Sequence, residues 1–261
     1  MTFHELHQGT APLLLPNAWD VPSALAFLDA GFTAIGTTSF GVAASAGRPD
    51  GERASREANL ALAAALRPLP GYLSVDIEDG YGDDPEQVAE YVAELAAVGV
   101  AGINIEDSSA EALISPDAHA AKVSAIKRRS PELFVNARVD TYWLGQDATP
   151  GATLTRAEAY VRAGADGVFV PGASEPAVLR DITTALPVPV NTLVIPGKSL
   201  AELAELGVRR VSTGSLPYRA AVRAAVAVAE AVRDNEALPA AVAYPDLQGR
   251  LVDYASSTTP R

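Results

Sequence analysis

Short apolar runs alternate with longer, alanine-rich segments along the whole chain, and this alternation constrains the fold more than any other feature. Eight apolar runs have the length of buried strands, and the segments between them have helical composition. Regular strand–helix alternation is typical of a parallel sheet, and eight units in 261 residues predict a closed (β/α)8 TIM-type barrel. An open, doubly wound sheet is the alternative, because periodicity says nothing about closure. The expected strands are Leu13–Ala18, Ala34–Ser39, Tyr72–Glu78, Gly102–Asp107, Leu133–Val139, Gly167–Pro171, Val188–Val194 and Arg210–Gly214.

The segments between the strands predict helices that end at glycines. At Gly31, Gly99, Gly164 and Gly207 a glycine is followed by a short turn and an apolar strand. Glycine adopts the left-handed conformation that closes a helix, so these sites are expected on the face of the barrel opposite the active site. The expected helices include Pro85–Val98, Pro116–Arg129, Leu154–Ala163, Glu175–Ala185 and Leu200–Leu206.

The domain organisation is expected to be simple. Residues 1–261 form a single domain, with the barrel at about 10–234 and a helical tail at 235–261. A last helical segment is expected at Pro217–Arg233, and a short helix in the tail around Leu247–Ala255.

Composition excludes several classes of function. The formal charge is −12, and the longest basic run is Lys127–Arg129, so nucleic acid and anionic lipid are not expected partners. No apolar stretch has membrane-spanning length, and a cytoplasmic protein is expected. The absence of cysteine excludes thiolate metal sites and a cysteine nucleophile.

Acidic residues gather where the third and fourth expected strands end, or in the loop before them. In a barrel, the carboxyl ends of the strands carry the active site. Alternation along a strand places Asp76 and Glu78 on one face. Crowded carboxylates raise one another's pKa unless a cation intervenes, and Mg²⁺ prefers one or two carboxylates together with water and substrate oxygens. The six acids are Asp50, Asp76, Glu78, Asp79, Glu106 and Asp107.

Other roles remain open for some of these groups. Asp79, Asp83, Asp84 and Asp107 follow strands, where acids often cap the next helix. Arg138, at the end of the fifth expected strand, has the geometry to bind a substrate carboxylate through two hydrogen bonds. A buried ion pair with an acid of the metal site or with a neighbouring aspartate is the alternative for Arg138.

The order of these motifs resembles the isocitrate lyase/phosphoenolpyruvate mutase superfamily. The resemblance runs from Pro16-Asn17-Ala18-Trp19-Asp20 to Val211-Ser212-Thr213-Gly214, which is most of the chain. It is carried by Ser39…Gly41-Val42-Ala43 with Pro49-Asp50, by Asp76-x-Glu78-x-Gly80-Tyr81-Gly82, by Gly102–Asp107, by Ala137-Arg138-x-Asp140, by Ala159-Tyr160 with Ala163–Asp166, and by Asn191.

The resemblance implies a Mg²⁺-dependent barrel enzyme that acts on 2-oxo acids or their adducts through an enolate-like intermediate. It implies that Asp76 is the direct metal ligand and that Asp50, Glu78 and Glu106 hold metal-bound water. It also implies that Arg138 binds the substrate carboxylate, so that Asp50, Glu106 and Arg138 are the expected catalytic residues. The remaining substrate-binding positions implied are the Ser39-Phe40-Gly41 turn, through its backbone N–H groups, together with Asp76 and Asn191.

Departures from the superfamily pattern bear on the reaction. The loop after the fourth strand, Ser108–Ile114, has no cysteine, lysine, arginine or asparagine, whereas the lyases carry a proton-donating cysteine there and the mutase branch carries lysine and asparagine. Glu78 stands where aspartate is usual, and Pro171 where the lyases have glutamate. Ser108, Ser109, Tyr81 and metal-bound water are the candidates for the general acid or base.

The expected function is that of a Mg²⁺-dependent carbon–carbon lyase or related hydrolase for a small 2-oxo or 2-hydroxy di- or tricarboxylate. Carbon–phosphorus chemistry on phosphonopyruvate is one alternative, and a 2-oxo acid binding protein with little turnover is another. Relatives of this kind exchange their last helix between subunits, so a homo-dimer or homo-tetramer is expected.

Overall fold

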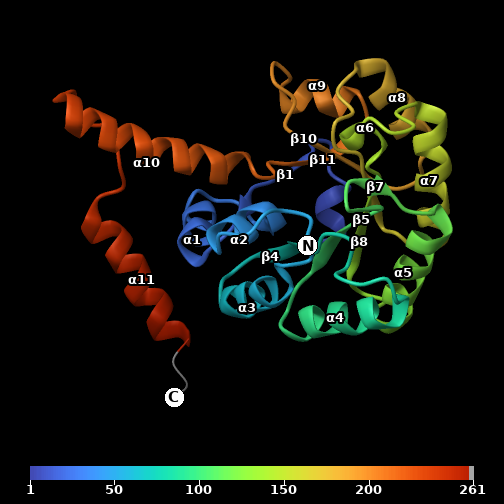
Figure 1. Ribbon diagram of the computed structural model, residues 1–261, viewed down its shortest axis with the longest axis horizontal. Helices are drawn as coiled ribbons and strands as arrows, with labels where there is room; N and C mark the ends of the chain where they lie inside the picture. Colours follow the sequence, from blue (N-terminus) through green and yellow to red (C-terminus); the bar gives the residue numbers. More distant parts are fainter. Residues whose placement is uncertain (259–261) are drawn as a thin grey trace.

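The computed structural model describes residues 1–258 and contains one large parallel sheet (Figure 1). Its strands follow one another in chain order around the sheet, apart from a small separate hairpin, β6–β7 (Ser108–Ser109 and Ala112–Leu113). The strands of the large sheet are β1 (Leu13–Leu15), β2 (Asn17–Ala18), β3 (Ala34–Thr37), β4 (Tyr72–Asp76), β5 (Gly102–Glu106), β8 (Phe134–Arg138), β9 (Gly167–Phe169), β10 (Val190–Leu193) and β11 (Val208–Ser212).

The sheet closes into a barrel through its first strand. Pro16 divides that strand into β1, which pairs with β11, and β2, which pairs with β3. Because β1 and β2 are the two ends of the strand order and are adjacent in the chain, the ring of strands is nearly complete. The predicted TIM-type barrel is confirmed, and the open, doubly wound alternative is wrong.

Helices cover the outside of the barrel and match the expected segments closely. The sequence did not predict helices at residues 21–29, 39–45, 56–66 or 141–144. The second and fourth of these helices directly follow strands β3 and β8 at their carboxyl ends, whereas the other two pack on each other and on the sheet. The helices before the C-terminal region are α1 (Val21–Asp29), α2 (Ser39–Ser45), α3 (Arg56–Leu66), α4 (Pro85–Ala97), α5 (Pro116–Arg129), α6 (Thr141–Leu144), α7 (Pro150–Arg162), α8 (Pro176–Ala185) and α9 (Leu200–Glu205).

The two C-terminal helices leave the barrel wall (Figure 1). Helix α10 (Leu216–Asp234) extends away from the barrel, and α11 (Tyr244–Thr258) runs back beside α1 and α3. Arg250 of α11 pairs with Asp29 at 2.7 Å, and the Tyr254 hydroxyl donates to the Ala65 carbonyl at 2.9 Å. The helix expected in the tail is present with wider bounds, and residues 259–261 of the expected tail lie outside the described residues.

Strand alternation divides the protein into an apolar layer and a partly polar interior. Side chains such as Val75, Ile103 and Val135 face the helices and are fully buried. At the amino ends of the strands, Phe3 and Phe134 pack edge to face in a small apolar cluster that fills the interior. Polar side chains occupy the interior toward the carboxyl ends, where the expected site residues lie.

Among the described residues, no helix has both the length and the apolar character that crossing a membrane requires.

Candidate active site at the carboxyl ends of the strands

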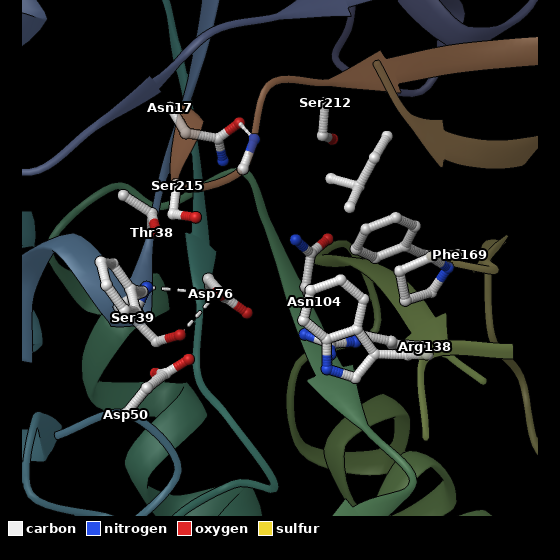
Figure 2. A pocket seen from close by; sticks show the side chains of 15 residues that line it. Asn17, Thr38, Ser39, Asp50, Asp76, Asn104, Arg138, Phe169, Ser212 and Ser215 are labelled. Carbon is white, nitrogen blue, oxygen red and sulfur yellow. Dashed lines mark hydrogen bonds between the residues drawn. The ribbon is translucent and has the colours of Figure 1, made fainter. Parts of the chain in front are cut away.

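A cavity of ≈ 80 Å³ opens at the carboxyl ends of the barrel strands (Figure 2). We call it the small cavity. A cavity of this size, open on one side, suits the head of a small organic acid. Side chains from several different strands and loops line it, including Asn17, Ser39, Asp76, Asn104, Arg138 and Ser212.

Asp76 is the last residue of β4, and one side of its carboxylate is held firmly. The Ser39 backbone N–H donates to Asp76 Oδ2 at 3.2 Å, and Ser39 Oγ donates to the same oxygen at 2.8 Å (Figure 2). Asn59 Nδ2 donates to the Asp76 backbone carbonyl at 2.5 Å, which fixes the end of the strand. Asp76 Oδ1 is buried and has no hydrogen-bond partner among the described residues. A buried carboxylate oxygen without a partner is costly unless a ligand or cation occupies the site.

The segment Ser39-Phe40-Gly41 was expected to be a turn and is instead the first turn of α2. Thr38 caps this helix, because its side chain accepts from the Gly41 backbone N–H at 3.4 Å. Ser39 and Phe40 line the small cavity, whereas Gly41 does not. A Cβ atom at Gly41 would lie 2.9 Å from Trp19 Cβ, so glycine is required there for packing.

Arg138, at the end of β8, faces the small cavity and is paired with two acids. Its Nε donates to Asp140 Oδ1 at 2.6 Å, and its Nη1 pairs with Glu106 Oε1 on the neighbouring strand. The ion-pair interpretation of Arg138 is therefore realised. Nη2 has no hydrogen-bond partner within residues 1–258, so carboxylate binding remains open to it. Burial raises the pKa of the Glu106 carboxyl well above its usual range, although Arg138 opposes the shift.

A second cavity, of ≈ 590 Å³, adjoins the first and shares Asp50, Arg138 and Trp143 with it. We call it the large cavity. Glu78 lines the large cavity rather than the small one. The expected alternation of Asp76 and Glu78 along one strand face is wrong, because β4 ends at Asp76 and Glu78 has a left-handed φ of 49°.

The carboxylate of Glu78 is held by the loop that contains Asp50. Ser55 Oγ donates to Glu78 Oε1 at 2.5 Å, and the Arg53 backbone N–H donates to Glu78 Oε2 at 2.9 Å. Burial raises the pKa of Glu78, while these hydrogen bonds oppose the shift. Asp50 itself lies in the exposed part of the loop and borders both cavities.

The remaining acids have structural partners. Asp84 caps α4 as expected, accepting from the Glu86 backbone N–H at 2.9 Å. Asp79 and Asp83 both bind Arg53, so neither acts as a cap. Asp107 also does not cap a helix, because Arg156 and the Tyr160 hydroxyl bind its carboxylate at 3.0 and 2.7 Å.

Two interior residues lie next to the small cavity rather than in its lining. Asn191, an expected substrate-binding residue, exchanges hydrogen bonds with Ser212 Oγ, and its neighbour Leu193 lines the cavity instead. Arg210, which sequence reasoning missed, is buried in the barrel and donates to Asn104 Oδ1 at 3.2 Å and to Ser212 Oγ at 3.2 Å. Burial lowers the pKa of Arg210 to about 9. The strand reads Val208-Arg209-Arg210-Val211-Ser212, and alternation along a strand sends one of two adjacent arginines into the barrel, which is the signal that could have found Arg210.

The residues present fit a hard divalent cation. Within the described residues, no three His, Cys, Asp or Glu side chains converge closely enough to form a complete metal cage. Asp76 Oδ1, with Asp50 also lining the small cavity, instead offers the one or two carboxylates that Mg²⁺ uses when water and substrate supply the other ligands.

Three comparisons relate this chain to known proteins. A Mycobacterium tuberculosis protein without an assigned function is 62% identical over 99% of both chains. The 2-methylisocitrate lyase of Bacillus subtilis is 32% identical, over 72% of this chain and 64% of the lyase. The structure of a phosphonopyruvate hydrolase in complex with oxalate and Mg²⁺ is 25% identical and covers 98% of both chains with a TM-score of 0.82. The phosphoenolpyruvate phosphomutase family matches residues 3–233, and the chain therefore belongs to this family of the phosphoenolpyruvate mutase/isocitrate lyase superfamily of enzymes.

Proposed function

We propose that this protein is a Mg²⁺-dependent lyase that cleaves a carbon–carbon bond in a small 2-oxo or 2-hydroxy acid, or a hydrolase that uses the same chemistry. The observation that carries the proposal is the buried, unpartnered Asp76 Oδ1 in the wall of the small cavity. The relatives that are lyases, and the related hydrolase structure that holds oxalate and Mg²⁺, support it.

Each wall of the small cavity has a part in this proposal. Asp76 holds the cation directly, and Ser39 orients Asp76 by binding its other oxygen. Asp50, which borders both cavities, and Glu78 and Glu106, which line the adjoining large cavity, orient water between the two. Arg138 binds the substrate carboxylate from the opposite wall, with its guanidinium held in place by Asp140 and Glu106. The cation, when bound, would stabilise negative charge that develops on the substrate's 2-oxo oxygen.

The positions of the hydroxyl groups near the cavities narrow the set of candidate proton donors. Ser108 and Ser109 lie in the β6–β7 hairpin and line the large cavity. Ser108 Oγ donates to Asp140 Oδ2 at 2.5 Å, which links it to the partner of Arg138. The Tyr81 hydroxyl contacts Ser55 and Asn59 and lines neither cavity. We therefore assign the donor role to Ser108, Ser109 or water rather than to Tyr81.

Calorimetry with oxalate, with and without Mg²⁺, tests the binding half of the proposal. Product assays with oxaloacetate, methylisocitrate and phosphonopyruvate test the reaction. We expect oxalate to bind only when Mg²⁺ is present, and a carbon–carbon bond to be the one cleaved. Binding without any turnover of a 2-oxo acid would indicate a binding protein, and phosphate release from phosphonopyruvate would indicate carbon–phosphorus chemistry.

A further inference from the structure

The charged side chains that line the two cavities are mostly acidic, although the buried Arg210 lies beside the small cavity, where it binds Asn104 and Ser212. Arg138 is the one basic side chain among the described residues that line either cavity. Its Nε and Nη1 are already paired with Asp140 and Glu106. The lining also contains the acids Asp50, Glu52, Asp76, Glu78, Asp79, Glu106 and Glu111.

One wall of the small cavity is apolar. Figure 2 shows Phe169 and Arg138 on the side opposite Ser39, Asp50 and Asp76. Phe169 is buried at the end of β9, and its ring lies 5.8 Å from the Arg138 guanidinium. The rest of this wall consists of Pro171, two residues after Phe169, Trp143 of α6 and Leu193 of β10. We call these four residues, Trp143, Phe169, Pro171 and Leu193, the apolar wall.

These two observations determine what the far end of a substrate would meet. The first carboxylate and the 2-oxo group have partners in Arg138 and in a cation at Asp76. A second carboxylate has no further basic side chain in either lining and would lie among acids of like charge. An alkyl or aryl group would instead bury its surface against the apolar wall, and each buried methylene is worth about fourfold in affinity. The cavities thus disfavour substrates with a second carboxylate and favour substrates with an apolar far end.

We infer that the substrate is a 2-oxo monocarboxylate with an uncharged, apolar group at its far end and an oxygen substituent at C4. A C4 hydroxyl lets the C3–C4 bond break to give the enolate of pyruvate and an aldehyde, and a C4 oxo group lets water cleave the same bond to give pyruvate and a second acid. This inference rests on the proposed function, because it uses the same head-group site. It departs from the di- or tricarboxylate that the family resemblance implies. The departure follows from the lining, in which Arg138 is the one basic side chain among the described residues that border either cavity.

A matched pair of acids tests the inference by calorimetry in the presence of Mg²⁺. 2-Oxoglutarate carries a distal carboxylate, and 5-methyl-2-oxohexanoate carries an isopropyl group of similar size in the same place. Oxalate has the two adjacent oxygen-bearing carbons of both acids and no further chain, so its binding measures the head-group site alone. We expect 5-methyl-2-oxohexanoate to bind at least tenfold more tightly than 2-oxoglutarate.

The outcomes separate the two proposals. If oxalate binds with Mg²⁺ but 2-oxoglutarate binds as tightly as 5-methyl-2-oxohexanoate or more tightly, the inference about the far end is overturned while the proposed function stands. If oxalate does not bind with Mg²⁺, the head-group site is wrong and both proposals fail.

Substitutions in the apolar wall test whether the far end of the substrate lies against it. Leu193→Lys and Trp143→Lys each add a cation to this wall, and Trp143 is 56% exposed, so the second variant should fold normally. We expect each to raise the affinity for 2-oxoglutarate about tenfold while oxalate binding persists. Leu200→Lys, which adds the same charge at the start of α9, is the matched control and should change neither affinity. No gain for 2-oxoglutarate in either wall variant would contradict the placement of the far end against this wall.

Discussion

Ser39 donates two hydrogen bonds to a single oxygen of Asp76, one from its backbone N–H and one from its hydroxyl, and the other oxygen of that carboxylate has no partner among the described residues. The two residues are far apart in the sequence and meet because β3 and β4 are adjacent in the barrel. Ser39 therefore fixes the orientation of Asp76 and leaves Oδ1 as the free acceptor. Such an arrangement holds a metal-binding oxygen in a fixed orientation before the cation binds.

Replacing Asp76 tests the metal assignment directly. Asp76→Ala should reduce Mg²⁺-dependent oxalate binding by at least about 100-fold, because the proposed direct metal ligand is lost. Titration calorimetry measures the effect, and circular dichroism should show that the barrel still folds. Asp117→Ala, at an exposed position in α5, is the matched control and should bind as the parent protein does. An Asp76→Ala protein that binds metal and oxalate normally would remove Asp76 from the site.

Arg138 should contribute to substrate binding through its shape as well as its charge. Arg138→Lys keeps a cation near Glu106 and Asp140 but loses the planar guanidinium. We expect oxalate affinity to fall about tenfold or more while Mg²⁺ alone binds as before. If oxalate affinity is unchanged, Arg138 serves only the ion pairs, which is the alternative role that the sequence left open.

The barrel followed from the sequence, while several details of the site depend on contacts that only the fold creates. The apolar runs marked each strand because parallel strands are buried on both faces, although Pro16 divides the first strand and the last begins at Val208, two residues before the expected start at Arg210. Helix α2 was missed because Ser39-Phe40-Gly41 has no helical periodicity of its own and depends on the Thr38 cap. The position of Glu78 was wrong because its left-handed backbone breaks the alternation on which the prediction relied.

Residues that line the site without carrying charge were the hardest to predict. Phe169 and Leu193 have the composition of ordinary core strands, and their place in the small cavity follows from where β9 and β10 end. The family resemblance implied a place in the lining for Asn191. The structure places it one layer deeper, beside Ser212.

Acid should weaken the fold through His119. This residue is fully buried beside Tyr160, with ring centroids 4.4 Å apart, and burial lowers its pKa from 6.5 to about 3. The folded protein keeps the ring neutral, whereas the unfolded chain binds a proton as the pH falls below about 6.5. The contribution of His119 to stability is therefore complete above that pH and is lost between pH 6.5 and 3, by up to about 1.4 kcal/mol per pH unit.

Urea unfolding of the parent protein and of His119→Phe at pH 7, 6 and 5 measures this loss. Phenylalanine keeps an aromatic ring beside Tyr160 and cannot take up a proton. We expect the variant to gain stability relative to the parent as the pH falls, whatever the carboxylates contribute to both proteins. A difference that stays constant from pH 7 to 5 would contradict the assignment.

Helix α10 leads us to expect self-association. Val222, Val226 and Val232 are 50%, 47% and 65% exposed on a helix that stands away from the barrel (Figure 1). We expect a homo-dimer or homo-tetramer by light scattering at micromolar concentration, in which these side chains are covered. Val222→Lys combined with Val226→Lys should shift the protein toward monomer, whereas Leu200→Lys should not. A parent protein that is monomeric at that concentration would rule out this assembly.

The absence of cysteine should limit turnover of the substrates that lyases of this superfamily cleave. A positioned general acid is worth roughly 10²–10⁴-fold in rate, and the β6–β7 hairpin offers only the hydroxyls of Ser108 and Ser109. The Ser108 hydroxyl also donates a hydrogen bond to Asp140 Oδ2 at 2.5 Å. A serine hydroxyl releases a proton far less readily than a thiol does. From a typical value of about 10 s⁻¹, turnover of isocitrate or methylisocitrate should fall to about 0.1 s⁻¹ or less. Steady-state assays with both acids measure this turnover, and rates near 10 s⁻¹ would show that an effective proton donor is present.

In that event the double variant Ser108→Ala and Ser109→Ala tests the nearest candidates, because turnover that survives both changes cannot depend on either hydroxyl.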